Sequence, residues 1–336
     1  MMKRTCCISL FLFLGGLLAG AQTVRIGIIG LDTSHAVAFT SLINDAQSSD
    51  PRIQKYEVVA AYPYGTRTIP SATDRIPFFI QEIQRYGVKI VDSIAELLSG
   101  VDCVLLETND GNLHLAQAVE VFASGRKIYI DKPLGATLAQ AIAIYEMAER
   151  YGVRFFSSSA VRFSAENVKI RSGAYGKVLG ADCFSPHVPE ASHPDFGYYG
   201  LHGVEELYTV MGTGCKSVSR VHTETGDVVI GRWEDDRIGT FRAITQGPYV
   251  YGGNAFIGDK AVPTGGYTGY SCLVDAILDF FETGESPVSK EETLELFTFM
   301  KASNMSLSKG GKEIAMEKAW KVGMKEAGKL LKKYDK

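Results

Sequence analysis

The chain has 336 residues, of which 46% are hydrophobic and 22% are charged, and its formal net charge is −3. This length suits two domains, and the composition is that of an ordinary globular protein. The lack of a basic excess argues against a nucleic-acid partner. Beyond the N-terminus no apolar run is long enough to cross a bilayer, so we expect no transmembrane helix in the mature chain.

The N-terminus has the pattern of a secretory signal peptide. Met1–Arg4 is short and basic, Ile8–Leu18 is apolar, and Ala19–Ala21 fits a small-residue cleavage site. We therefore expect residues 1–21 to direct Sec-type export to the periplasm or the medium, with an uncleaved membrane anchor as the alternative. Because the signal lacks a twin arginine, we expect the chain to be transported unfolded.

Residues 22–155 alternate between apolar strands and amphipathic helices. This alternation predicts a Rossmann-like domain, an α/β fold with a doubly wound parallel sheet. The expected strands are Arg25–Ile29, Glu57–Ala61, Lys89–Val91, Asp102–Leu106, Lys127–Ile130 and Arg154–Ser157, and the main helices are Pro77–Tyr86, Ile94–Leu98, His114–Ser124 and Leu138–Tyr151.

The turn after the first strand resembles a damaged phosphate-binding loop. A G-x-G-x-x-G pattern is expected there, but after Gly30 the second glycine is Asp32 and the third is His35. If the Asp32 carboxylate faces the phosphates, repulsion between charges about 4 Å apart is about 4 kcal/mol at an effective dielectric of 20. Alternatively Asp32 points aside, and the hydroxyls of Thr33 and Ser34 contact the phosphate.

The ribose end of the predicted nucleotide site is also atypical. A carboxylate is expected soon after the second strand, but none occurs before Asp74. Thr66 and Arg67 suit a 2′-phosphate, which favours NADP over NAD. The alternative is a plain surface turn built on Pro63 and Gly65.

Residues 156–312 have longer strands with glycine-rich and aromatic joints. They predict an α+β domain with a mainly antiparallel open sheet that has one exposed face. The expected strands are Val178–Phe184, Ser217–His222, Val228–Trp233, Ile238–Ile244 and Tyr249–Ile257, followed by helices Leu273–Glu282 and Glu291–Ser306. Residues 313–336 predict an amphipathic C-terminal helix, which either packs on the body of the protein or lies on a membrane surface.

Two side chains stand out as candidates for acid–base chemistry. Lys132 follows the strand Lys127–Ile130, and the carboxyl ends of parallel strands face the ligand crevice of such sheets. A desolvated lysine there can exchange a proton, although a surface turn at Pro133 is the plainer interpretation. His202 opens an apolar helix, where an imidazole can transfer a proton near neutral pH.

A metal centre is not predicted from the sequence. Three histidines and three acids lie close together in the chain, but their spacing matches no known ligand pattern. These residues are His187, His193, His202, Glu190, Asp195 and Glu205.

Four segments together resemble the glucose–fructose oxidoreductase / inositol dehydrogenase / MocA (Gfo/Idh/MocA) family over nearly the whole mature chain. Residues 131–133 resemble its E-K-P motif, and residues 108–114 resemble T-P-N-x-x-H with one residue added. Residues 159–163 resemble N-x-R-F, and residues 200–205 resemble the end of D-x-G-x-H-x-x-D, with Tyr198 in place of the first aspartate.

Together with the signal peptide, the resemblance implies an exported oxidoreductase that acts on a sugar or polyol with NAD or NADP. It implies catalytic roles for Lys132 and His202, and a sugar side lined by Arg162, His187 and Tyr198. The residues expected to contact the cofactor are Gly30, Asp32, Thr33, Ser34, Thr108, Asn109, His114 and Lys132. It further implies a homo-oligomer formed through the open sheet of the second domain.

The departures from the family pattern support a second hypothesis. Asp32, Tyr198 and export to a compartment that does not replenish nicotinamide cofactors favour a cofactor-free protein on the same fold. Such a protein would bind a carbohydrate or carry out a lyase-like reaction.

Overall fold

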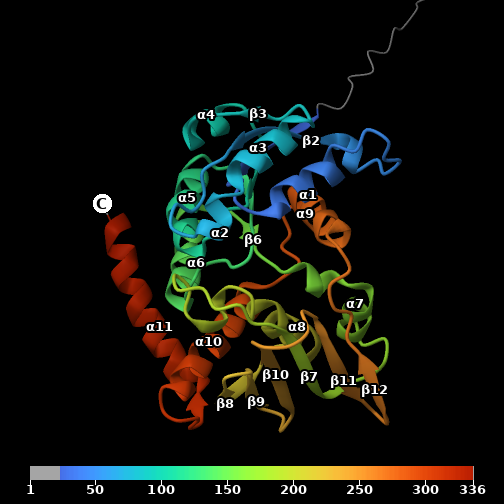
Figure 1. Ribbon diagram of the computed structural model, residues 1–336, viewed down its shortest axis with the longest axis vertical. Coiled ribbons are helices and arrows are strands. Elements are labelled where there is room, and N and C mark those ends of the chain that lie inside the picture. Colours follow the sequence, from blue (N-terminus) through green and yellow to red (C-terminus); the bar gives the residue numbers. More distant parts are fainter. Residues whose placement is uncertain (1–22, 336) are drawn as a thin grey trace, which may run out of the picture.

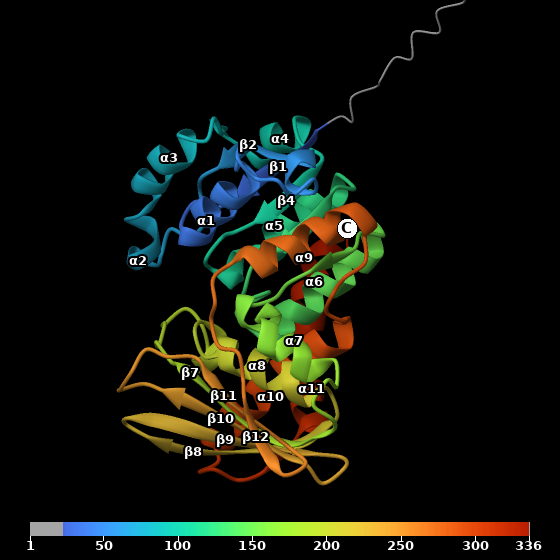
Figure 2. The ribbon, with the colours of Figure 1, turned by 90° about the vertical axis from the view of Figure 1, so that its right-hand side faces the viewer.

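The computed structural model describes residues 23–335, which contain two β-sheets with helices packed on them (Figures 1 and 2). The predicted signal peptide, residues 1–21, lies outside the described residues. Among the described residues, no helix is both long and apolar enough to cross a membrane.

The first sheet is parallel and has six strands in the order β3-β2-β1-β4-β5-β6. This order confirms the predicted Rossmann-like fold. The strands are β1 (Val24–Ile29), β2 (Tyr56–Tyr62), β3 (Lys89–Ile90), β4 (Cys103–Leu106), β5 (Lys127–Ile130) and β6 (Phe155–Phe156). The helices of this half are α1 (Ser34–Ile43), α2 (Pro70–Thr73), α3 (Ile76–Gln84), α4 (Ile94–Ser99), α5 (Gly111–Ala123) and α6 (Leu138–Tyr151), with a 3-10 turn η1 (Ile53–Lys55).

Helices cover both faces of the first sheet, which explains the continuous apolar run of β4. Cys103 and Leu105 pack with the helices on one face, including α1, whereas Val104 and Leu106 pack with α4, α5 and α6 on the other. The first face also holds α9 (Ser271–Thr283), which comes from the second half of the chain and lies beside α1 (Figure 1). The sequence had placed this helix with the second domain.

The second sheet has seven strands in the order β12-β11-β7-β10-β9-β8-β13, and all its pairs are antiparallel except β7 with β10. The strands are β7 (Val178–Pro186), β8 (Cys215–Thr223), β9 (Gly226–Trp233), β10 (Ile238–Ile244), β11 (Gly252–Ile257), β12 (Lys260–Pro263) and β13 (Ile314–Ala315). The other elements of this half are α7 (Ala165–Arg171), α8 (Leu201–Met211), α10 (Lys290–Leu307), α11 (Met316–Leu331) and the 3-10 turns η2 (Ala160–Phe163), η3 (Asp195–Gly197) and η4 (Lys332–Tyr334).

One face of the second sheet is covered by helices, as the alternation in β10 predicts. Gly239, Phe241 and Ala243 are buried toward α8, while the residues between them are half-buried or exposed. In Figure 2 α8 and α10 lie on one side of this sheet, and no helix lies on the other.

The C-terminal helix α11 packs back on the body of the protein, against α6 and α10. Its buried stripe includes Ala319 and Ala327. At Gly323 the helix comes so close to α6 that an added Cβ would overlap Leu138. Of the two alternatives for this helix, the structure therefore has the packed one.

Candidate active site

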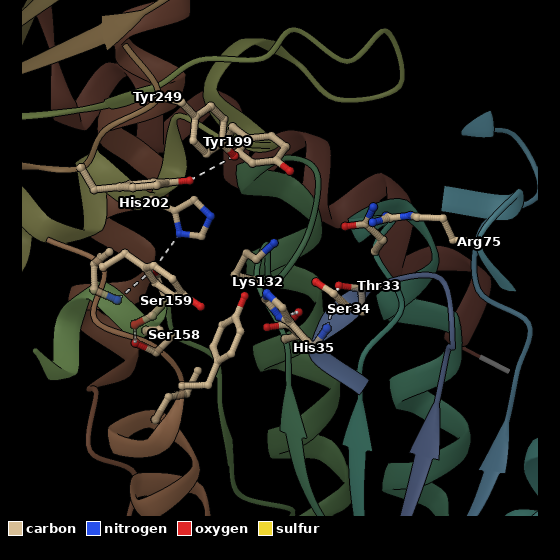
Figure 3. Close-up of a pocket in the computed structure, with 18 residues that line it drawn as sticks. Thr33, Ser34, His35, Arg75, Lys132, Ser158, Ser159, Tyr199, His202 and Tyr249 are labelled. Atoms are coloured by element: carbon tan, nitrogen blue, oxygen red, sulfur yellow. Dashed lines mark hydrogen bonds and ion pairs between the residues drawn. The ribbon is translucent and has the colours of Figure 1, made fainter. Parts of the chain in front are cut away.

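A cavity of about 270 Å³ lies where the carboxyl ends of the first sheet meet the second half of the chain (Figure 3). Ligands of open α/β sheets bind at this edge. The first half contributes Thr33, Ser34, His35, Arg75, Asn109, Asp131 and Lys132. The second half, beginning after β6, contributes Ser158, Ser159, Ala160, Val161, Tyr199, His202, Tyr249, Tyr251, Tyr267, Tyr270 and Leu273.

The phosphate-type loop keeps the one glycine that its backbone requires. Gly30 has φ +94°, and an added Cβ would lie 2.6 Å from the Thr108 backbone nitrogen. Thr33 caps α1, because its Oγ1 accepts a hydrogen bond from the His35 backbone N–H (3.3 Å). The N-terminus of α1 therefore faces the cavity, together with the Thr33 and Ser34 residues that line it.

The Asp32 carboxylate points away from the cavity and is fully buried. It accepts hydrogen bonds from the backbone N–H groups of Thr66 (2.8 Å) and Asn109 (3.1 Å), so it joins three loops. Gly65 packs so tightly on it that an added Cβ would overlap the carboxylate. Burial raises the pKa of Asp32, although the two N–H groups oppose this effect. The expected repulsion between Asp32 and a phosphate does not arise in this arrangement.

Arg75 is the cation at this end of the cavity, and sequence reasoning missed it. Its Nη2 donates to the Asp32 carbonyl oxygen (3.1 Å), and in Figure 3 the side chain lies on the same side of the pocket as Thr33 and Ser34. The guanidinium of Arg67, the candidate named from the sequence, lies over the Tyr64 ring at 4.9 Å and does not line the cavity. No motif marks Arg75, which reaches the loop only through the fold.

Most of the segment after β4, residues 108–114, lies behind the cavity wall and does not line the cavity. Only Asn109 lines the cavity, and its Nδ2 donates to the Tyr198 hydroxyl (2.6 Å). His114 is fully buried, with Nε2 2.6 Å from the Thr108 carbonyl oxygen and Nδ1 3.2 Å from that of Leu134. Thr108 and His114 thus hold the loop in place without lining the cavity.

Lys132 and His202 approach the cavity from opposite walls (Figure 3). His202 Nδ1 lies 2.6 Å from Ser159 Oγ, which fixes the orientation of the ring. Its enclosed position and the charge of Lys132 hold the pKa of His202 well below its ordinary value. The imidazole is therefore neutral and can accept a proton.

The three residues predicted for the sugar side do not line the cavity. Arg162 is buried and bonded to Glu205 (Nε to Oε1, 2.9 Å) and to Glu292 (Nη1 to Oε1, 2.5 Å). His187 is buried with its ring against Phe196.

Tyr198 is buried behind the cavity, where its hydroxyl accepts the bond from Asn109. Its neighbour Tyr199 lines the cavity instead. The sequence motif thus marks a segment that reaches the cavity, but the side chain that lines it is Tyr199 and not Tyr198.

Five tyrosines line the second-half wall of the cavity, and none of them was among the residues predicted from the sequence. They are Tyr199, Tyr249, Tyr251, Tyr267 and Tyr270. The Tyr251 ring stands perpendicular to that of His202 with centroids 5.5 Å apart. A wall of rings and hydroxyls suits a ligand with both apolar and hydrogen-bonding faces.

Comparison with known proteins agrees with this geometry. Residues 24–159 match the Gfo/Idh/MocA family model, described as an oxidoreductase family with an NAD-binding Rossmann fold. The match covers the first domain, which is therefore similar to this family. No curated protein sequence matches the chain.

Several solved structures share the fold over most of the chain. GenD2 from gentamicin A biosynthesis, solved with NAD, is 15% identical, with a TM-score of 0.69 over 88% of this chain and 96% of GenD2. A probable dehydrogenase from Thermotoga maritima is 18% identical, with a TM-score of 0.68 over 88% of this chain and all of that one. The scyllo-inositol dehydrogenase from Lactobacillus casei, solved with NAD(H) and scyllo-inositol, is 12% identical, with a TM-score of 0.68 and the same coverage.

Proposed function

We propose that the protein is an oxidoreductase that moves hydride between a sugar or polyol and a nicotinamide cofactor. The observation that carries this proposal is the placement of Lys132 and His202 across one cavity that begins at the N-terminus of α1. The NAD and scyllo-inositol in structures of the same fold support it by analogy.

The residues around α1 fit the diphosphate of such a cofactor. The N-terminus of α1, the side chains of Thr33 and Ser34 and the Arg75 guanidinium all suit an anion, and the Asp32 charge is turned away. When bound, the nicotinamide supplies the acceptor or donor of hydride. Nothing at the Arg67 turn selects between NAD and NADP, because that guanidinium lies over Tyr64.

His202 and Lys132 handle the proton of the substrate hydroxyl. The neutral His202 ring, oriented by Ser159, accepts the proton as the alcohol is oxidised, and returns it in the reverse direction. The Lys132 ammonium stabilises negative charge that develops on the same oxygen. The tyrosine wall orients the sugar ring and excludes water.

We further propose that the protein is exported, on the pattern of residues 1–21 alone. We also propose that it forms a homo-oligomer through the uncovered face of the second sheet. Val221, Ile238 and Phe256 are exposed there, and exposed apolar side chains on an uncovered sheet face support an interface.

Native mass spectrometry of mature protein from its own compartment tests the cofactor, followed by acid release of any bound small molecule. A stoichiometric NAD(H) or NADP(H) is the expected result. A chain that holds no dinucleotide and also fails to bind added NAD(H) or NADP(H) contradicts the proposal. It then favours the cofactor-free carbohydrate-binding or lyase-like alternative.

A double substitution tests the chemistry. K132A with H202A is expected to lower kcat for a responsive polyol by about 10⁴-fold or more, since proton transfer alone contributes about 10² to 10⁴. The matched control is K89A with H222A, which removes a lysine and a histidine outside the cavity. Turnover at the wild-type rate in K132A/H202A overturns the assignment of these residues.

A further inference from the structure

The side chain of Glu107, at the carboxyl end of β4, is buried without hydrogen bonds. It is fully buried, and neither carboxylate oxygen has a hydrogen-bond partner among the described residues. A carboxylate removed from water without a partner is costly, and native proteins rarely leave one so. Something other than the described side chains is therefore needed to satisfy it.

Two further ligand-type side chains meet Glu107 at the floor of the cavity. His35 comes from the first turn of α1, and Asp131 follows β5. One ligand atom from each of the three residues lies within 4.8 Å of the others. Their strands β1, β4 and β5 are neighbours in the first sheet, so the parallel order brings the three strand ends together.

The groups around this cluster support a fixed geometry. His35 Nδ1 lies 2.7 Å from Asp131 Oδ2, and the Tyr129 hydroxyl donates to Asp131 Oδ1 (3.2 Å). Lys132 acts electrostatically on both carboxylates, but no hydrogen bond joins it to Glu107, and in Figure 3 its ammonium points into the cavity. The oxygens of Glu107 thus lie within the electrostatic reach of Lys132 but have no hydrogen-bond partner among the described residues.

We propose that His35, Glu107 and Asp131 bind a divalent first-row metal ion at the floor of the cavity. One imidazole and two carboxylates are a ligand set that suits Zn²⁺ or Mn²⁺. Tyr129, bonded to Asp131, is the kind of outer partner that orients a metal ligand. This trio is not the histidine-rich group weighed from the sequence around residues 187–205.

The position of the ion implies what it can bind. His35 and Asp131 line the cavity, whereas Glu107 lies behind them. The remaining coordination positions therefore face the cavity, toward Lys132 and the tyrosine wall. An oxygen ligand of the substrate, such as a hydroxyl or carboxylate, is the class of group that completes this coordination.

Metal uptake by the mature protein tests the proposal. The protein is stripped with a chelator, dialysed against Zn²⁺, Mn²⁺ or Mg²⁺ in parallel, and analysed by elemental mass spectrometry. We expect one Zn²⁺ or Mn²⁺ per chain and a rise in Tm on binding. Absence of uptake by the wild-type protein overturns the proposal, whatever the cofactor measurements give.

The variant E107Q locates the ion. Loss of an outer-shell partner alone weakens metal binding by about 10- to 100-fold, so loss of this ligand is expected to weaken it by about 100-fold or more and to abolish the rise in Tm. The metal-free variant is expected to fold, because the substitution removes a buried charge. Wild-type metal affinity in E107Q overturns the proposal.

The matched control is E206Q. Glu206 is another buried acid with an unpartnered oxygen (Oε2), but it lies in α8, next to Asn167 and Gly266. Its substitution is expected to leave metal affinity unchanged. The same pair of variants separates a metal site from a general effect of removing a buried carboxylate.

Discussion

Two regions of the molecule each bury two carboxylates, but they differ in whether the carboxylate oxygens have hydrogen-bond partners. In the cluster of Arg162, Glu205 and Glu292, a buried guanidinium lies between the acids, and each carboxylate oxygen has a partner. At the cavity floor, Glu107 lies beside Asp131 with no partner of its own.

This difference distinguishes residues that stabilise the fold from residues that are available to bind a ligand. Arg162 was expected to bind sugar, yet its Nε and Nη1 bond two acids that hold η2, α8 and α10 together, and its buried Nη2 has no partner among the described residues. Carboxylates whose oxygens are all bonded, such as those of Glu205 and Glu292, have no place left for a ligand, whereas the unbonded oxygens of Glu107 do. Three substitutions test this distinction, beginning with the largest expected effect.

R162M leaves Glu205 and Glu292 without their shared cation. Breaking a buried pair by removing one partner costs about 3–5 kcal/mol, so the free energy of unfolding, measured with urea, is expected to fall by that amount. R171M is the control, because Arg171 bonds the same Glu292 but is 42% exposed, and its loss is expected to cost less. A change in sugar affinity with unaltered stability would return Arg162 to the substrate side.

D32G restores a glycine to the phosphate-type loop but leaves the N–H groups of Thr66 and Asn109 without an acceptor. Each unsatisfied buried donor costs about 1–3 kcal/mol, so with two donors the free energy of unfolding is expected to fall by roughly 2–6 kcal/mol. Dinucleotide affinity is expected to stay near the wild-type value, since the carboxylate already points away. A thousandfold gain in affinity, measured by calorimetry, would contradict the observed direction of Asp32.

His193 extends the comparison to a buried side chain whose hydrogen bond requires the neutral form. Its Nε2 accepts a hydrogen bond from the Gly111 backbone N–H (3.2 Å), and burial lowers its pKa. In the unfolded chain this histidine has an ordinary pKa of about 6.5 and binds more protons than in the folded chain below that pH. The free energy of unfolding is therefore highest above about pH 6.5 and falls as the pH decreases below it.

Urea unfolding at pH 7.5 and 5.5 measures this dependence. The wild-type protein is expected to lose stability through His193, by at most about 1.4 kcal/mol per pH unit below 6.5. H193Q keeps an acceptor without titrating, so its loss is expected to be smaller by that amount. An equal loss in both proteins would assign the pH dependence to other groups.

The sequence was sufficient for the fold because periodicity depends on local residues. Alternating strands and helices identified the first sheet, and the alternation in β10 identified the exposed face of the second. Lys132 and His202 reach the cavity because each directly follows or begins an element whose direction the pattern defines.

The rest of the site depends on contacts between distant segments. The direction of Asp32 is decided by N–H groups 34 and 77 residues away in the chain. Tyr249 and Tyr251 were expected within a strand, but β11 begins only at Gly252, so both rings lie in a loop at the cavity. Glu107 directly follows the expected strand Asp102–Leu106, and nothing local indicates that His35 and Asp131 lie beside it.

Because α9 packs on the first sheet, the first domain shares its core with a helix from the second half of the chain. Ile277 and Phe280 of this helix share a core with Ile26 and Phe156. A fragment ending at residue 159 would expose these side chains to water, although that is where the family match ends. The segment that matches the family model is therefore shorter than the segment that shares this core. Tyr270, at the cap of α9, connects the cavity wall to that core.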